Sequence, residues 1–137
     1  MMKFDTKIAV VLREDLAVWQ KLNVTAFTIS GIAGTVAGIV GQDYEDGSGK
    51  LYLPMIVQPI MVFSATADQL RKVYERAMSR ELRFSIYTEE LFSTGNDTDN
   101  RAAVKAVPSA ELKIVGLAVR AEKNSVDKVL KGLSLHQ

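Results

Sequence analysis

Apolar residues along the chain fall into two kinds of pattern, which predict strands and helices in alternation. Residues 7–12 form a short, almost wholly apolar and β-branched run, the pattern of a strand that is covered on both faces. A second set recurs at the i, i+3, i+4, i+7 and i+8 spacing of one helix face. Its members are Leu70, Val73, Tyr74, Ala77 and Met78. Thr66 and Gln69 have the spacing of a capping box, so this helix is predicted to begin just after Thr66.

The other runs complete the alternation. Extended segments are predicted at residues 51–57, 59–64, 82–88 and 112–120. Helices are predicted within residues 22–41, 99–107 and 125–130. Residues 59–88 then form a strand-helix-strand unit, for which a right-handed crossover is expected. Alternation of this kind predicts one α/β domain over residues 1–137, a three-layer α/β/α sandwich with a mixed central sheet.

Four glycines recur at spacings of three and four residues, at Gly31, Gly34, Gly38 and Gly41. Glycine costs a helix up to about 1 kcal/mol per site relative to alanine, so this stripe predicts that something packs very close to it. Packing against a sheet or a second helix is one explanation, and a ligand that approaches the bare backbone is the other. Residues 42–50 carry Asp-Gly and Ser-Gly pairs and are predicted to be a solvent-exposed loop.

Composition narrows the classes of function. The chain has 137 residues, with 17 Lys and Arg against 16 Asp and Glu, so its net charge favours neither a nucleic acid nor a membrane as partner. Cysteine is absent, which excludes disulfides and thiolate chemistry. The longest apolar region, residues 24–40, falls short of a membrane span, and no signal peptide is recognisable. A cytoplasmic protein is expected.

Basic residues do gather around the helix predicted after Thr66, at Arg71, Lys72, Arg76, Arg80 and Arg83. Asp68, Glu75 and Glu81 lie between them, so a solvated helix face is expected rather than an RNA-binding stripe. The alternative, RNA binding through phosphates, predicts an affinity that falls steeply with salt.

The residues available for catalysis are few. His136 is the sole histidine and lies next to the end of the sequence, where chains are commonly frayed, so a catalytic triad has no suitable middle member. No His or Cys cluster can hold zinc, and neither of the common phosphate-binding glycine motifs follows a strand. No cofactor or metal is therefore expected, and carboxylate, lysine, hydroxyl and backbone amide groups remain.

The first polar cluster follows the strand predicted at residues 7–12, a position at which open α/β sheets usually bind ligands. It comprises Arg13, Asp15, Lys21 and Asn23. Asp15 and Lys21 form a candidate proton-transfer pair because each perturbs the pKa of the other. The alternative is a surface salt bridge or a carboxylate that caps the helix. Trp19, the only tryptophan, is expected to cover the helix entry rather than to stack on a ligand.

The second polar cluster is the stretch LFSTGNDTDNR, residues 91–101. Gly95 suits a tight turn, and Asp97 or Asp99 is predicted to cap the following helix, with Arg101 about one turn inside it. Free amides at a helix start attract anions, so a clamp for an anion or polar ligand is one interpretation. Its residues are Thr94, Gly95, Asn96, Asp97 and Arg101. The alternative is a turn whose own acidic groups already occupy the amides.

The whole chain resembles a known family. REDLAVWQKLNV, ELFSTGNDTDNRAAV and VGLAVRAEKNSVDKVLKGL are similar to a family of small bacterial proteins known as a domain of unknown function. That family in turn resembles the type II peptidyl-tRNA hydrolases, compact α/β/α proteins that are often dimers and cleave the ester between a peptide and tRNA. The resemblance therefore implies the type II peptidyl-tRNA hydrolase fold and a homodimer.

The match to the hydrolase pattern is partial. Arg13, Asp15 and Leu16 match its Arg-x-Asp-Leu element, and Lys21 matches the helix-start lysine if one residue is deleted. Residues 114–119 resemble its late apolar strand. The histidine of the first helix is missing, and TEELFSTGND stands where the hydrolases have an Asp-Ala-Gly turn.

Two functional hypotheses follow. In the first, the protein is an enzyme in which Asp15 orients water or substrate and Lys21 stabilises developing negative charge, and the resemblance implies hydrolysis of an ester or amide. In the second, the same pocket binds a small-molecule or peptide-like ligand without catalysis, through Arg13, Asn23 and the residue 94–101 loop. The glycine stripe and residues 51–63 could form a subunit contact or belong to the core.

Overall fold

The computed structural model describes residues 3–137 and contains four helices and two short 3-10 turns around a five-stranded mixed sheet. The sheet strands are β1 (Thr6–Arg13), β4 (Ile60–Ala65), β5 (Phe84–Thr88), β6 (Ile114–Glu122) and β7 (Ser134–Leu135). The helices are α1 (Val18–Thr35), α2 (Ala67–Ser79), α3 (Asp97–Lys105) and α4 (Lys123–Val129), and the turns are η1 (Glu89–Ser93) and η2 (Ser109–Glu111). A separate two-stranded hairpin consists of β2 (Tyr44–Glu45) and β3 (Leu51–Tyr52).

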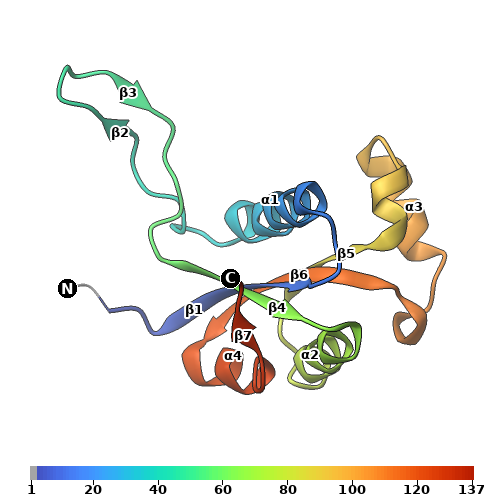
Figure 1. Ribbon diagram of the computed structural model, residues 1–137. Coiled ribbons are helices and arrows are strands. Elements are labelled where there is room, and N and C mark those ends of the chain that lie inside the picture. The colour runs from blue at the N-terminus through green and yellow to red at the C-terminus, as the bar shows by residue number, and fades with distance from the viewer. Residues whose placement is uncertain (1–2) are drawn as a thin grey trace.

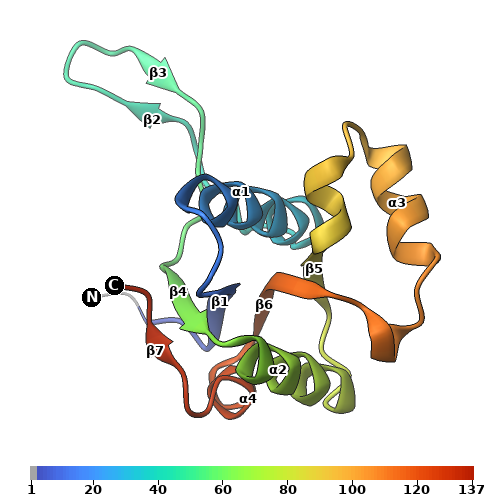
Figure 2. The same cartoon turned by 45° about the vertical axis from the view of Figure 1, so that its right-hand side comes forward.

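The sheet has the order β5-β6-β1-β4-β7, with α1 on one face and α2 and α4 on the other (Figures 1 and 2). The central strand β1 runs parallel to β4 and antiparallel to β6, so that Val10 lies between Val62 and Ala118. The predicted α/β architecture with a mixed sheet is therefore confirmed. The strands β4 and β5 that flank α2 run in the same direction, but β1 and β6 separate them.

Each face of the sheet has its own apolar core, as the uninterrupted run at residues 7–12 predicts. Ile8, Val10 and Leu12 pack toward α1, whereas Ala9 and Val11 pack toward α2 and α4. The capping box of α2 is also confirmed, because the Thr66 hydroxyl accepts from the backbone nitrogen of Gln69 at 3.1 Å. Met78 departs from the predicted stripe: it is 47% exposed, while the other four members are buried.

The four glycines do not form one helical stripe, although two of them pack closely as predicted: Gly31, and Gly41, where an added Cβ would lie 2.9 Å from Cγ1 of Val57. Because α1 ends at Thr35, Gly38 and Gly41 lie outside the helix, and Gly38 has a φ of 76° that suits a turn. Gly34 faces open space, and only Gly31 packs closely within the helix, where an added Cβ would lie 3.3 Å from the Cβ of Ser85. A tighter approach occurs at Gly116 of β6, where an added Cβ would lie 2.4 Å from Cγ1 of Val24.

Residues 39–58 leave the body of the protein as a projecting arm that contains β2 and β3 (Figure 1). The predicted loop at residues 42–50 forms its tip, whereas the extended run at residues 51–57 is a strand only at Leu51–Tyr52. The arm joins the body at Gln58, which is 7% exposed, and its amide nitrogen donates to the Thr6 carbonyl at 3.2 Å. Within residues 3–137, no helix has the length and apolar character needed to cross a bilayer.

Candidate functional site

The predicted Asp15–Lys21 pair is not formed: within residues 3–137, no hydrogen bond or ion pair links the two side chains. Arg13 lies at the end of β1, where its Nε donates to Asp15 at 2.6 Å and its Nη1 donates to Glu89 at 2.7 Å. The hydrogen bond to Glu89 raises the pKa of Arg13 most, burial opposes this shift, and the bond to Asp15 adds to it. Asp15 is thus half of a largely exposed ion pair, and any catalytic role for it stays a prediction.

Lys21 has a different partner, which comes from the far end of the sequence. Its Nζ lies 3.2 Å from Nε2 of His136, and the His136 backbone nitrogen donates to the Val62 carbonyl at 2.9 Å. Strand β7 therefore extends the sheet and places the sole histidine beside the first turns of α1. Sequence reasoning set His136 aside because chain ends are commonly frayed, and a two-residue strand offers no periodic signal that could have found it.

Asn23 is half-buried, and its side-chain oxygen has no hydrogen-bond partner in the part of the chain that the structure describes. It lies one turn from Trp19 and one turn from Phe27, whose rings pack on Phe92 and Tyr87 with centroid distances of 5.7 and 6.0 Å. Trp19 is 58% exposed and meets Phe92 edge-on, which agrees with a covering role at the helix entry.

The residue 94–101 loop satisfies most of its own polar groups. Asn96, rather than Asp97 or Asp99, caps α3, because its side-chain oxygen accepts from the Asp99 backbone nitrogen at 2.8 Å. Arg101 donates to Asp97 at 2.6 Å, and this hydrogen bond raises the Arg101 pKa. The Thr94 hydroxyl contacts the Leu91 carbonyl and the Asn100 side chain. No left-handed backbone is found at Gly95, so the turn does not depend on that residue being glycine.

Two cavities lie beside the sheet, and of the nine predicted site residues only Arg13 lines either of them. The first cavity has a volume of about 520 Å³ and lies between the end of β1 and the start of α2. Its wall carries charges of both signs, and both of its arginines are engaged: Arg13 with Asp15 and Glu89, and Arg71 with the Leu112 carbonyl, while Lys113 lines the same wall. Most of its donors therefore already have acceptors within the protein.

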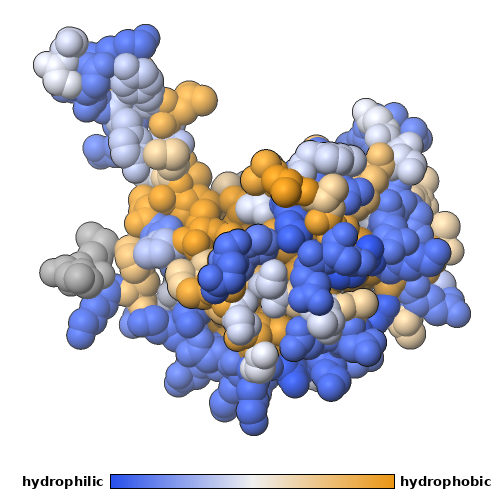
Figure 3. Space-filling model, in the orientation of Figure 1, coloured by the Kyte–Doolittle hydropathy of each residue, from blue (hydrophilic) through white to orange (hydrophobic). Residues whose placement is uncertain are grey.

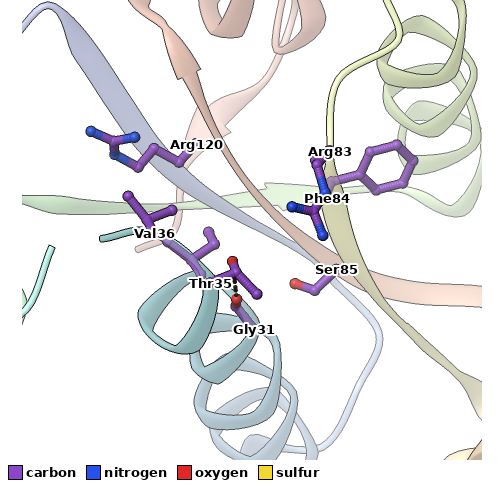
Figure 4. A pocket seen from close by; sticks show the side chains of 8 residues that line it. Gly31, Thr35, Val36, Arg83, Phe84, Ser85 and Arg120 are labelled. Carbon is purple, nitrogen blue, oxygen red and sulfur yellow. Dashed lines mark hydrogen bonds between the residues drawn. The ribbon is translucent and has the colours of Figure 1, made fainter. Parts of the chain in front are cut away.

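The second cavity has a volume of about 350 Å³ and lies between the C-terminal half of α1 and the neighbouring ends of β5 and β6 (Figure 4). We call it the arginine pocket. It is lined by Gly31, Ile32, Thr35, Val36, Arg83, Phe84, Ser85 and Arg120. Figure 4 shows the hydroxyls of Thr35 and Ser85 toward its centre and the guanidinium of Arg83 above them, while the side chain of Arg120 lies on the opposite side and extends away from Arg83.

Strand pairing brings these two arginines together. The antiparallel register of β5 and β6 sets Phe84 opposite Val119 and Ser85 opposite Ala118, which brings the residues before Phe84 alongside those after Val119. Side chains alternate between faces along a strand, so Arg83 and Ser85 share a face. That face also packs against α1, where Gly31 has no side chain to fill the space above Ser85.

The arginine pocket contains hydrogen-bond donors without acceptors. Arg83 has no hydrogen bond or ion pair within residues 3–137, and Arg120 uses only its Nε, which donates to Gln58 at 3.2 Å. The hydroxyls of Ser85 and Thr35 donate to the carbonyls of Thr28 and Gly31 at 2.7 and 2.6 Å, which leaves their oxygens as acceptors. The pocket therefore offers cationic donors at its sides and hydroxyl acceptors near its centre.

The sequence carries no local signal for this pocket, because Arg83 continues the run of charges around α2 and Arg120 ends an apolar strand. The two-residue periodicity at residues 83–87 does place Arg83 and Ser85 on one face, but the pairing with β6 is a long-range contact that no local pattern contains. Among the described residues, no group of three or more His, Asp or Glu side chains is arranged to hold a metal ion.

A family model described as "Protein of unknown function (DUF2000)" matches residues 6–137. The chain belongs to the DUF2000 family. Its fold also matches a solved structure, that of the protein of unknown function Atu0240 from Agrobacterium tumefaciens strain C58, with a TM-score of 0.96 and 48% sequence identity over 98% of this chain and 100% of that one. No curated protein matches this DUF2000 chain. The resemblance to a bacterial family of unknown function is confirmed, and neither match names an activity.

Proposed function

We propose that this DUF2000 protein binds a small ligand that carries a carboxylate or phosphate group, and that the ligand occupies the arginine pocket. One observation carries the proposal: two guanidinium groups without an acidic partner in residues 3–137 line one cavity of about 350 Å³. This volume lies in the usual range for small-molecule sites. Arginine is also the side chain whose planar donors fit carboxylate and phosphate best.

The energetics of the empty pocket support the same ligand class. Like charges on neighbouring strands are unfavourable for a sheet, and an anion bound in the pocket would offset the charges of Arg83 and Arg120. Each charge-assisted hydrogen bond contributes about 1.5–3 kcal/mol. Because the ligand binds only the folded protein, its presence at about 100 times its dissociation constant raises the free energy of unfolding by about 2.7 kcal/mol.

The test is a thermal-shift screen of mono- and dicarboxylates and phosphorylated metabolites, followed by calorimetric titration of any compound that raises the melting temperature. Arg83→Gln is expected to weaken binding at least tenfold, which corresponds to the loss of about 1.4 kcal/mol. The matched control is Arg80→Gln, which removes the same charge from an exposed position outside the pocket wall. Arg101→Ala is the second control, because it tests the residue 94–101 loop instead.

Three results would count against the proposal. They are a screen without any binder, a binder whose affinity Arg83→Gln leaves unchanged, and a binder that Arg101→Ala releases while Arg83→Gln does not. The last of these would place the ligand at the residue 94–101 loop.

A second candidate function is hydrolysis of an ester or amide, as in the type II peptidyl-tRNA hydrolases. The contact of 3.2 Å between Lys21 and His136 favours it, because an imidazole can transfer a proton while an ammonium stabilises negative charge. Wild-type protein is assayed against short peptidyl-tRNAs and amino-acyl esters. His136→Gln and Lys21→Met are each expected to lower turnover at least about a hundredfold, and exposed Lys128→Met is expected to leave it unchanged.

Asp15→Ala separates the two versions of this candidate. Loss of turnover with an unchanged melting temperature would assign catalysis to Asp15 with Lys21, whereas unchanged turnover would leave it to Lys21 with His136. Absence of wild-type turnover on every substrate would exclude the candidate.

A further inference from the structure

We propose that two copies of this chain associate by exchanging arms, so that the arm of each copy (residues 39–58) lies across the outward face of α1 in the other. The inference rests on the arm and on α1, and it does not depend on the ligand proposed for the arginine pocket. The partner is a second copy of the chain, because one chain supplies both a projecting apolar arm and an apolar surface to receive it.

The arm is ordered by its own hydrogen bonds although it projects from the body. At its base, the Val57 nitrogen donates to the Ile39 carbonyl at 2.9 Å, and the Gly41 nitrogen donates to the Met55 carbonyl at 3.0 Å. At its tip, the Asp46 carboxylate accepts from two backbone nitrogens and, at 2.8 Å, from the Tyr52 hydroxyl. A preorganised arm loses little conformational entropy when it docks, which favours binding.

This ordered arm exposes apolar side chains that the rest of the same chain does not cover. Leu53 is 85% exposed, Met55 60%, Leu51 57% and Val57 50%. An isolated two-stranded hairpin is marginally stable in water, and apolar side chains gain free energy only when a surface covers them. Figure 3 shows the apolar side chains gathered over the base of the arm and along α1.

Helix α1 presents a matching surface. Its sequence VWQKLNVTAFTISGIAGT contains Lys21 as its single charged residue, and an apolar stripe on a helix is normally buried against another surface. One side is covered by the sheet, yet Val18 is 73% exposed, Leu22 67% and Phe27 57%. Next to this side, Ile29 and Ala33 of α1 and Pro54 and Met55 of the arm line an apolar hollow of about 430 Å³.

The dimensions of the two parts agree. The 18 residues of α1 span about 27 Å, and about ten extended residues on each side of the arm span about 33 Å. Four strongly exposed large apolar side chains lie on α1 and eight lie within residues 40–60, against two elsewhere in residues 3–137. Each such side chain has an area of roughly 150–200 Å², of which about half is exposed. The side chains on α1 and within residues 40–60 therefore expose an area on the order of the 800 Å² that each partner buries in a stable interface.

A twofold arrangement satisfies both surfaces at once. If the arm of one copy covers α1 of the second, the same rotation places the second arm on α1 of the first, and no further apolar surface is left to recruit a third copy. A heterologous protein partner would cover one arm and one helix but would need its own matching pair of surfaces.

The first test is the oligomeric state of the full chain, measured by sedimentation velocity over a range of concentrations. The wild type is expected to be dimeric. Leu53→Asp on the arm and Leu22→Asp on α1 are each expected to weaken dimerisation at least about thirtyfold, as loss of a central interface side chain does. Met78→Asp is the matched control, because Met78 is 47% exposed on α2, on the opposite face of the sheet. Far-ultraviolet circular dichroism checks that each variant is folded.

The second test is a cross-link between two different copies, which the absence of cysteine in the chain makes clean. A tagged Leu53→Cys protein is mixed with untagged Leu22→Cys protein, and diamide oxidises the two thiols to one disulfide. The expected product is a covalent dimer with one tagged and one untagged chain, which is absent when Met78→Cys replaces Leu22→Cys. A monomeric wild type, or a dimer that neither the arm variant nor the α1 variant weakens, would overturn the proposal. A dimer without the mixed cross-link would overturn the exchange of arms.

Discussion

The contact between Gly116 and Val24 permits a quantitative prediction. Gly116 lies in β6 beneath α1, and a methyl group there would lie 2.4 Å from Cγ1 of Val24 and 3.2 Å from the Val11 carbonyl oxygen. Val24 is fully buried and β-branched, so its side chain has few alternative rotamers. We expect Gly116→Ala to push α1 away from the sheet and to lower the free energy of unfolding by about 2–3 kcal/mol, the upper part of the range for overpacked cores.

The assay is chemical denaturation at one fixed protein concentration, because the proposed self-association would make stability depend on concentration. For a chain of this length, the melting temperature should fall by about 3–5 °C per kcal/mol. Val24→Ala alone should cost about 2 kcal/mol through lost burial and the cavity left behind. In the double variant the new methyl group occupies that cavity, so the two losses should overlap by at least about 1 kcal/mol. A Gly116→Ala loss below about 0.5 kcal/mol, or strict additivity, would refute the packing argument.

Three further predictions concern single sites. Gly34→Ala should raise the free energy of unfolding by up to about 1 kcal/mol, because the site is helical and open. Gly31→Ala should raise it by less, because the added methyl group would lie 3.3 Å from the Cβ of Ser85. Equal gains in denaturant titration would contradict this difference. Thr66→Ala should cost about 1 kcal/mol, since it removes the cap of α2, and an unchanged denaturation midpoint would argue against that cap. Burial raises the pKa of Tyr87 above its ordinary value, so the free energy of unfolding should fall as the pH rises above about 10, where the tyrosine ionises first in the unfolded chain. Tyr87→Phe should flatten this dependence of stability on pH. An equal dependence in both proteins would rule out Tyr87 as its cause.

Local patterns in the sequence were sufficient for most elements of the fold. The strand at residues 7–12 and the capped helix after Thr66 depend on side chains that are close in sequence, and both are present. The order of the strands and the projection of the arm depend on long-range pairing instead. Residues 51–57 illustrate the limit, because their apolar character suggested a strand or core, yet most of them lie on an exposed arm.

The candidate site was harder to predict for the same reason. Arg83 meets Arg120 only through the pairing of β5 with β6, and Lys21 meets His136 only because β7 adds to the edge of the sheet. The residue 94–101 loop could be recognised as a helix start because Asn96 caps its own helix locally. Its role in ligand binding, like that of Asp15, stays a prediction.

The side-chain amide of Gln58 would link the two proposed binding events, an anion in the arginine pocket and the exchange of arms, thermodynamically. Its oxygen accepts from Arg120 at 3.2 Å and from the Thr6 hydroxyl at 3.3 Å, so the base of the arm and a wall of the arginine pocket share one hydrogen-bond network. An anion that draws Arg120 away from Gln58 changes the anchor of the arm, and reciprocity requires that arm exchange change anion affinity by the same factor. Anion affinity should then differ between protein concentrations below and above those at which the chain dimerises, and Gln58→Leu should remove the difference. Together the two proposals predict that the arm transmits ligand binding to subunit association.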